Sequence, residues 1–497
     1  MKKNDWILIS AAASYSYLFY QQAPGINFMI FTLILILLFA ARNYRVLNNI
    51  NWKITALGAI VSGVFVMLYG NSLSVAANLL SLMVLSAYTF TASSSFLIAL
   101  AQSAYSVITA CSNLFKSYKH KQRKKNIHES FPIYIKHLTW LIPLVITIIF
   151  FLIYREANPV FSNLTKDIRI NFISIPWILF TILGTVLVYG LLFPRKIKSL
   201  FIIDKKAKNT FNSSDLTDYN STWFGKYFGM KNEVKTGAFL LILLNILLLS
   251  VNIIDIGYLW IDQKIPEGMS YSQYVHQGTE LIIFSVISAI FIILFFFRGH
   301  LNFYEGNKYL KYLAYAWIIQ NIFMIVSTGY RNQLYIEVFG LTYKRLGVYM
   351  YLLLTLAGLI TTFIKVKNIK SSWFLFRKNA WILYSLLILA CIVNWDKQIT
   401  NYNLSYSKNV DIEYLIDLSY INIPYFIEAN PQLFTDDDIY YGSKRMVSIK
   451  KQLKHKIILF ENEYKQSDWQ SWSFHKSKVF EVIQNHRQNI QKGNVTN

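Results

Sequence analysis

The chain has 497 residues, of which 54% are hydrophobic and 15% are charged. Soluble domains carry about a quarter charged residues, so this composition excludes an ordinary soluble protein and predicts an all-α, polytopic membrane protein. The formal net charge of +23 would favour nucleic-acid binding in a soluble chain, but residues 395–497 hold 13 basic and 12 acidic side chains. The basic excess therefore lies among the apolar segments, where it indicates cytoplasmic loops, and we expect no nucleic-acid partner.

Apolar runs recur along the chain, each long enough or nearly long enough to cross about 30 Å of hydrocarbon as a helix. The twelve runs cover residues 6–20, 26–41, 54–68, 73–90, 96–115, 138–154, 173–193, 237–260, 279–297, 314–328, 346–364 and 380–395. We interpret the first as a spanning helix rather than a cleaved signal peptide, because no small-residue cleavage site precedes the second run.

The positions of the basic loops reduce the twelve runs to eleven crossings. Arg42, Arg45 and Lys53 form one basic loop, and residues 116–136 form a denser one. If both loops face the cytoplasm, an even number of crossings separates them, although three apolar runs lie between. Residues 96–115 are the run that we expect not to cross, because their polar side chains share one helical face, as is typical of a helix at the interface or packed on the bundle.

This topology divides the chain into three predicted regions. Residues 1–135 hold four spans, the interfacial helix and a basic cytoplasmic loop; residues 136–395 hold seven spans; and residues 396–497 form a small helical domain outside the membrane, with Asp411 as a helix N-cap. The N-terminus then faces the cytoplasm. One loop contradicts the charge rule, because residues 328–345 are expected outside and yet are basic.

Four stretches of sequence occur in a recognisable order. They read ANPVF at residues 157–161, SYSQYVHQGTELIIF at 270–284, STGYRNQLYIEVFGLTYKR at 327–345 and NYNLSYSKNVDIEYLIDLS at 401–419. Together they resemble bacterial membrane proteins of the families called domain of unknown function 4173 and 4153. The resemblance covers roughly residues 150–480. It implies a multi-pass protein of the bacterial cytoplasmic (inner) membrane and brings no established activity.

The chain has no motif typical of a known reaction. It has no His-Glu-x-x-His, no Gly-x-Ser-x-Gly, no phosphate-binding P-loop and no Cys or His pair at zinc-binding spacing. We therefore expect no metal site, no cofactor and no catalytic residue. The preferred hypothesis is a non-enzymatic transport, sensing or scaffold role in the cell envelope, and the alternative is a membrane enzyme acting on a lipid-linked or envelope substrate.

Seven ionisable residues are expected to share the outer side of the membrane. They are Arg155, Glu156, His276, Glu280, Arg331, Glu337 and Arg345. Glu280 lies just inside an apolar run, where an unpaired carboxylate is costly, so Arg331 and Arg345 are its natural partners. Two interpretations stay open: an outward-facing pocket whose arginines hold an anionic group, or ion pairs that lock helix ends and the C-terminal domain together.

Two further polar sets have predicted contacts. The basic cluster predicts binding to anionic lipid headgroups, since each basic residue near such a surface contributes about 1 kcal/mol. Its members are Lys116, Lys119, Lys121, Arg123, Lys124 and Lys125. Asn245, Asn252, Gln320 and Asn321 lie within spans, where amide side chains favour hydrogen bonds between helices. We also expect the C-terminal domain to offer a surface to an envelope protein.

Overall fold

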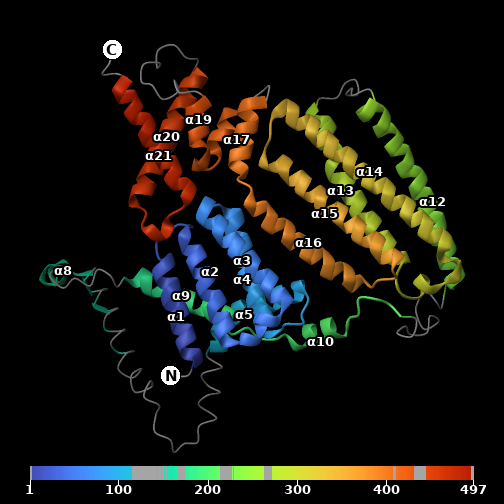
Figure 1. Ribbon diagram of the computed structural model, residues 1–497, viewed down its shortest axis with the longest axis horizontal. Helices are drawn as coiled ribbons and strands as arrows, with labels where there is room; N and C mark the ends of the chain where they lie inside the picture. The colour runs from blue at the N-terminus through green and yellow to red at the C-terminus, as the bar shows by residue number, and fades with distance from the viewer. Residues whose placement is uncertain are drawn as a thin grey trace, which may run out of the picture. The chain divides into compact units, whose positions relative to one another are not determined.

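The computed structural model describes most of the chain, and the described part is helical (Figure 1). The described residues are 3–114, 143, 147, 150–151, 154–155, 157–165, 174–212, 227, 229–261, 271–406, 410–429 and 444–493. Within them the only pairing of extended backbone is an isolated β-bridge between Thr210 and Lys370. The predicted all-α class is confirmed.

Seven described helices are long and apolar enough to cross a membrane. They are α3 (Ile50–Tyr69), α4 (Ser72–Phe90), α9 (Ile175–Leu192), α12 (Met230–Asp255) with its π-helical extension η4 (Ile256–Ile261), α14 (Lys308–Phe339) with its leading turn η6 (Glu305–Asn307), α15 (Tyr343–Lys367) and α16 (Ser372–Ile392). The chain is therefore an integral membrane protein by the length and composition of its helices. The total of eleven crossings stays a prediction, because residues 138–154 lie largely outside the described part.

Four other described helices occupy predicted apolar runs. They are α1 (Lys3–Phe19), α2 (Ile26–Arg42), α5 (Phe96–Ile108) and α13 (Tyr271–Phe296). One boundary was wrong: residues 328–345 were expected to form a loop, but α14 continues as far as Phe339. The polar side chains of that last stretch find partners within the protein, as described below, so they do not end the helix.

The chain divides into two compact units, which we describe separately. The first consists of Met1–Ile202 with Lys465–Ser477, and the second of Ile203–Tyr464 with Lys478–Asn497. These units follow packing and do not follow the expected boundary between membrane and soluble parts. The three predicted regions therefore stay a prediction.

Small residues let the helices of the first unit approach closely. Ala59 and Ser62 of α3 face Ala77 and Asn78 of α4, and all four side chains are fully buried. The Asn78 amide donates to the Ala59 carbonyl (2.9 Å) and to Thr32 Oγ1 of α2 (3.0 Å). Small residues and interhelical amide bonds are what hold helices together in lipid, where burial of apolar surface gives no driving force.

At one end of the first unit, α2, α4 and α9 all finish around one arginine. The guanidinium of Arg42 lies between the rings of Phe90 and Phe193, 4.2 and 4.1 Å from their centroids. Helix C-termini carry partial negative charge, so a cation among three of them is stabilised without a carboxylate.

The opposite end of the first unit holds the returning C-terminal segment. The Ile26 amide donates to the Trp472 carbonyl (2.9 Å), Ala23 N donates to Ser471 Oγ (2.9 Å), and a ring nitrogen of His475 lies 3.1 Å from the Leu68 carbonyl. This segment thus lies at the end of the unit where α1 and α3 finish and α2 begins. The predicted topology requires the same arrangement, since it places the loop after the first span and the C-terminal domain on one side.

Helix α5 contacts the segments that follow α4 and α9 through one residue at its middle and one in its last turn. Thr91 Oγ1, just after α4, donates to Gln102 Oε1 (3.1 Å), and Arg195 N, just after α9, donates to Ser106 Oγ (2.8 Å). Its 13 residues span about 20 Å, and after one turn residue the chain is helical again over residues 110–114. The interfacial placement of residues 96–115 therefore stays a prediction.

In the second unit, α14 lies between α12 and α15, and α13 packs on α14 and α15 (Figure 1). Leu241, Ile293, Leu310 and Leu359 are completely buried at these contacts. The opposite face of α12 is apolar and exposed, with Phe239 at 65%, as suits a helix that faces lipid.

The C-terminal helices of the second unit have a core of their own. It is formed by α17 (Trp395–Tyr406), α18 (Ile412–Asp417), α19 (Ile423–Ala429), α20 (Lys444–Gln466) and α21 (Phe474–Gly493), which bury Leu415, Phe426, Leu453, Phe460 and Val479. Asp411 Oδ1 accepts from the Tyr414 amide (3.1 Å), which confirms the predicted N-cap.

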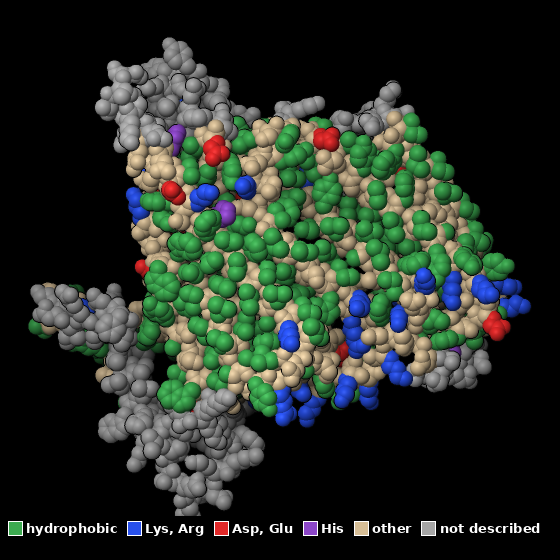
Figure 2. All heavy atoms as spheres, viewed as in Figure 1, with side chains coloured by type: hydrophobic (Ala, Val, Ile, Leu, Met, Phe, Trp, Pro, Cys, Tyr) green, Lys and Arg blue, Asp and Glu red, His purple; other side chains and the backbone are tan. Residues whose placement is uncertain are grey.

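Lys and Arg side chains gather along one end of the membrane helices in the second unit (Figure 2). We call this the basic end. At it, α13 and α15 finish and α14 and α16 begin, and its basic residues include Arg298, Lys308, Lys311, Lys365, Lys367, Arg377 and Lys378. This is the distribution expected of helix ends that face the cytoplasm.

Candidate functional site

At the end opposite the basic end, the motif at residues 327–345 holds the last turn of α12. The side chain of Arg331 forms an ion pair with Asp255, and the two side chains are 14% and 7% exposed. Trp260 of η4 donates from Nε1 to Ser327 Oγ (3.2 Å) and stacks on Tyr330 with ring centroids 5.0 Å apart. An aromatic stack and a buried pair thus fix α12 to α14.

Arg345 binds the C-terminal end of α14. Its Nη1 donates to the carbonyls of Phe339 (2.9 Å) and Gly340, and its guanidinium lies 4.3 Å from the Tyr335 ring centroid. The last carbonyls of a helix lack partners within the helix, so a cation there both bonds them and offsets the helix dipole. Gly340 has φ +81°, a conformation that favours glycine and that turns the chain into α15.

Helix α17, which follows later in the chain, holds this turn through hydrogen bonds. Asn403 accepts from Leu341 N (2.5 Å) and donates to Leu341 O (2.8 Å), so one amide side chain satisfies both backbone groups. Tyr343 N donates to the hydroxyl of Tyr414 (3.0 Å). The motifs at residues 327–345 and 401–419, far apart in sequence, therefore meet in space.

A buried carboxylate joins the start of α15 to the C-terminal helices. Asp396, in the first turn of α17 and 7% exposed, accepts from Tyr343 OH (2.7 Å) and from Ser419 Oγ. Hydrogen bonds from two hydroxyls compensate the carboxylate for lost water. We call residues 327–345 together with Asp255, Asp396, Asn403 and Tyr414, which contact them, and Ser419, which bonds Asp396, the hub.

Lys456 of α20 lies beside the hub in a cage of oxygen atoms. Its Nζ donates to the carbonyls of Ile416 (2.5 Å), Leu418 (2.6 Å) and Ser419 (3.2 Å) and to Asn422 Oδ1 (3.2 Å). Burial lowers the pKa of Lys456 to about 8, against the opposing effect of nearby carboxylates such as that of Asp396. The ammonium bonds carbonyls at the end of α18, as the Arg345 guanidinium does at the end of α14.

A concave pocket of about 650 Å³ opens between α18 and α20. Its polar lining includes Glu413, Asp417, Ser419, Tyr420, His455 and Lys456. Two of these residues, Ser419 and Lys456, also make the contacts just described around Asp396 and the end of α18. The pocket and the hub therefore share side chains.

The chain belongs to the DUF4153 family. The family's sequence profile, described as Domain of unknown function (DUF4153), matches residues 7–429. This confirms one of the two families that the four stretches resemble, and the related family 4173 is not shown. No curated protein and no solved structure matches the chain.

The family match also corrects the extent of the resemblance. It was expected to cover roughly residues 150–480, but it begins at residue 7, so the N-terminal spans belong to the family as well. The hub lies within the matched residues, while Lys456 lies beyond them. The matched residues thus include the junction between α14, α15 and α17, and α20 follows the end of the match.

The structure describes only some of the ionisable residues expected on the outer side. Arg331 and Arg345 lie in the hub, and Glu337 accepts from Gln333 on the exposed surface of α14 (3.2 Å). His276 and Glu280 are on α13, but their side chains lie outside the described part, so the pairing of Glu280 with the arginines stays a prediction.

The remaining predicted residues are undescribed or belong to the first unit. Arg155 belongs to a short helical piece of the first unit. Glu156 and the basic cluster from Lys116 to Lys125 lie outside the described residues.

Sequence reasoning missed Asp255 as a partner of Arg331. A signal was available, because Asp255 lies inside the apolar run 237–260, and the cost of an intramembrane carboxylate applies to it as much as to Glu280. Asp396 and Asn403 could not be found in this way, since they lie in a polar segment whose contacts depend on the tertiary fold.

The amide side chains within the spans do bond between helices. Gln320 of α14 donates to Asn245 Oδ1 of α12 (2.8 Å), and Asn252 donates to the Gln320 carbonyl (3.3 Å). Asn321 instead donates to Trp317 O in its own helix (2.7 Å). The prediction is confirmed for three of the four residues.

Proposed function

We propose that this chain is a non-enzymatic sensor of the bacterial cell envelope, set in the cytoplasmic membrane, whose outward-facing pocket takes a small polar ligand. The observation that carries the proposal is that Ser419 lines the pocket and also bonds Asp396. Asp396 in turn bonds Tyr343, the first residue of α15. Occupancy of the pocket is thereby linked to the first residue of the membrane helix α15 through two hydrogen bonds.

The physical basis of this link is the cost of a buried carboxylate without partners. If a ligand binds the Ser419 hydroxyl, Asp396 loses a hydrogen-bond donor. If a ligand displaces the Lys456 ammonium from its acceptors, Asp396 loses a nearby positive charge. The carboxylate must then recruit another partner or the junction must open, since an unsatisfied buried group costs about 1–3 kcal/mol. A ligand shifts a conformational equilibrium only through such differences in contacts, and Ser419 supplies one.

The lining of the pocket favours a ligand with hydroxyl or amino groups. Lys456 already donates to four oxygen atoms. The other polar or aromatic groups of the lining are the carboxylates of Glu413 and Asp417, the amide of Gln452, the ring of Tyr420 and the imidazole of His455. Carboxylates accept from hydroxyl and ammonium donors, and an aromatic ring attracts a cation or a sugar face.

The distribution of charges supports the orientation that we propose for the sensor. With the basic end of the second unit in the cytoplasm, the hub and pocket lie outside, where an envelope ligand or an envelope protein docking on the C-terminal helices has access. The basic cluster at Lys116–Lys125 would then contact anionic headgroups of the cytoplasmic leaflet.

The alternative is a membrane enzyme that acts on a lipid-linked or envelope substrate. Such an enzyme needs a base free to accept a proton from the substrate. Asp396 already accepts from two hydroxyls, and Lys456 is surrounded by acceptors. These contacts disfavour Asp396 and Lys456 as catalytic groups, so an enzyme would have to use Asp417 or His455 of the pocket lining as its base.

A labelling experiment on the full chain in lipid nanodiscs tests the proposal. The exposed Cys111 is replaced by Ser, and His455→Cys, at the pocket wall, is modified with a bulky maleimide that mimics an occupant. The readout is hydrogen exchange of the Leu341 and Tyr343 amides, which are bonded to Asn403 and Tyr414. We expect modification to speed their exchange at least fivefold.

The matched control is Asn462→Cys, on an exposed residue of α20 outside the pocket lining. The same maleimide there should leave the two amides unchanged. Equal exchange in the two modified proteins would refute the coupling. Separately, labelling of His455→Cys by an impermeant maleimide only from the cytoplasmic side would refute the orientation.

A further inference from the structure

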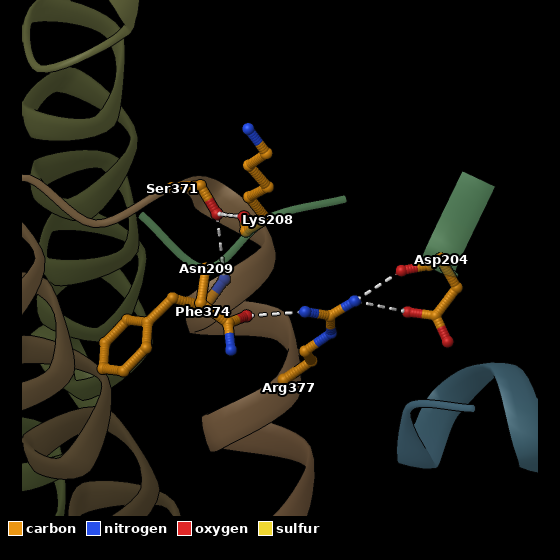
Figure 3. A network of polar contacts seen from close by, with 6 residues as sticks. All are labelled: Asp204, Lys208, Asn209, Ser371, Phe374 and Arg377. Atoms are coloured by element: carbon orange, nitrogen blue, oxygen red, sulfur yellow. Dashed lines mark hydrogen bonds and ion pairs between the residues drawn. The ribbon is translucent and has the colours of Figure 1, made fainter. Parts of the chain in front are cut away.

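At the basic end of the second unit, a short helix is fixed to the start of α16 by an ion pair between a buried carboxylate and a partly exposed arginine (Figure 3). The helix is α10 (Lys198–Lys206), and its Asp204 is 2% exposed. Arg377 of α16 donates from Nη2 to Asp204 Oδ1 (2.9 Å) and to Asp204 O (2.6 Å), and from Nη1 to Asn209 Oδ1 (2.6 Å). One guanidinium thus binds both the end of α10 and the segment that follows it.

Backbone contacts extend this attachment along the chain. Ser371 Oγ donates to Lys208 O (2.6 Å), and Ser371 N donates to Asn209 O (3.0 Å). Thr210 forms the isolated bridge with Lys370. Residues 204–210 therefore lie directly against the beginning of a membrane-spanning helix, at the level where that helix starts.

The side of α10 turned away from Asp204 is both apolar and basic. Ile202 and Ile203 are 49% and 51% exposed, and Lys205 and Lys206 are exposed beside them. Exposing two isoleucines of a nine-residue helix to water costs free energy. The same face is suited to a membrane surface, where apolar side chains enter the acyl boundary and lysines reach the headgroups.

The start of α16 has a matching composition. Phe376 is 59% exposed, Trp373 stands one turn before Arg377 with its ring centroid 5.9 Å from the guanidinium, and Lys378 is exposed. Aromatic side chains concentrate at headgroup depth in membrane proteins. We call Ile203, Lys205, Lys206, Phe376 and Lys378 the basic rim; they lie on α10 and on the start of α16, which the Asp204–Arg377 pair joins.

We propose that the basic rim binds anionic phospholipid headgroups, with the Asp204–Arg377 pair positioning α10 at the membrane surface. The lysines supply the charge complementarity, and the interleaved isoleucine and aromatic side chains distinguish a lipid surface from nucleic acid, which would be met by basic residues on a polar face. This inference does not rest on the pocket or on the sensor function.

The test measures lipid binding to the full chain by native mass spectrometry during titration with phosphatidylglycerol and, separately, with phosphatidylcholine. The variant Lys205→Gln/Lys206→Gln removes two exposed charges and leaves the Asp204–Arg377 pair intact. We expect its phosphatidylglycerol affinity to fall by roughly 30-fold, as about fivefold for each lysine near an anionic surface implies. The control Lys451→Gln/Lys465→Gln, on exposed lysines of α20, should stay within twofold of the parent.

A second variant separates lipid from free phosphate. Ile202→Ser/Ile203→Ser keeps every charge and should weaken phosphatidylglycerol binding at least threefold, while millimolar inorganic phosphate should compete poorly in the parent. Unchanged phosphatidylglycerol affinity in the double lysine variant would overturn the proposal. So would equal binding of phosphatidylcholine in the parent, or full competition by inorganic phosphate, which would indicate a site for a free anion.

Discussion

The two ends of the second unit bury carboxylates in different ways. At the basic end, Glu233 and Asp204 are 4% and 2% exposed, but their partners Arg298 and Arg377 remain 36% and 24% exposed. At the hub, Arg331 is only 14% exposed beside Asp255. The basic end therefore presents the outer side of its ion pairs to the surroundings, whereas the hub encloses both partners.

The difference indicates what each end is built to contact. A partly exposed arginine keeps donors for water or for a lipid headgroup, and neighbouring lysines add to that capacity. An enclosed pair has no such freedom, and its desolvation must be offset by geometry within the protein. In and beside the hub, cations also bond carbonyls at helix ends, as Arg345 does for α14 and Lys456 for α18.

The largest expected effect is the loss of one partner of the enclosed pair. Asp255→Leu leaves Arg331 buried without its carboxylate, and removing one partner of a buried pair costs about 3–5 kcal/mol. The double variant Asp255→Leu/Arg331→Met should recover most of that loss. Thermal unfolding of the full chain in one detergent measures both. A double variant no more stable than Asp255→Leu would contradict an isolated pair and point to a further partner of Arg331, such as Glu280.

A smaller loss is expected where the hub is held by an uncharged side chain. Asn403→Ala removes both bonds to Leu341, at about 1 kcal/mol each. Tyr402→Ala, on an adjacent residue that does not hold the turn, is the control. Hydrogen exchange of the Leu341 amide should rise by roughly 30-fold in Asn403→Ala alone. Protection unchanged in that variant would mean that the α14–α15 turn does not depend on α17.

The spans were predictable because residence in lipid depends on local composition. The run 346–364 falls within α15, and the run 314–328 falls within α14. The run starting at residue 380 missed the first turns of α16, because Trp373 to Lys378 mixes aromatic and basic residues in a way that hydropathy alone does not interpret as part of a span.

The candidate site was predictable only in part. Arg331 and Arg345 attracted attention because they oppose the charge bias, and both have specific partners in the hub. Their partners are set by tertiary contacts: Asp255 lies 76 residues before Arg331, and Asp396 lies 53 residues after Tyr343. A single sequence carries no information on such pairings beyond residue type, which is why the Asp396–Ser419 link to the pocket was not foreseen.

The comparison between the ends predicts a smaller penalty at the basic end for the same kind of change. Asp204→Leu should cost about 1–2 kcal/mol in thermal unfolding, less than Asp255→Leu, because the remaining Arg377 can turn toward solvent or headgroups and is not left buried. The double variant Asp204→Leu/Arg377→Met serves as the control for packing. If Asp204→Leu destabilises the chain as much as Asp255→Leu, the contrast between an open and an enclosed end is wrong.

A pH dependence of stability is expected at Lys456. Its pKa in the folded chain is about 8, lowered by burial from 10.5, so between these values the unfolded chain binds more protons than the folded chain. Stability then rises with pH across this window, and below pH 8 the lysine contributes no slope. The measurement is the difference in unfolding free energy between the parent and Lys456→Met from pH 7 to 10.5, which cancels the titration of the other tyrosines and lysines. The difference should shift in favour of the parent as pH rises above 8. A flat difference would mean that the ammonium keeps its proton in the carbonyl cage, and the contacts with Ile416, Leu418 and Ser419 would then hold the pKa near its ordinary value despite the burial.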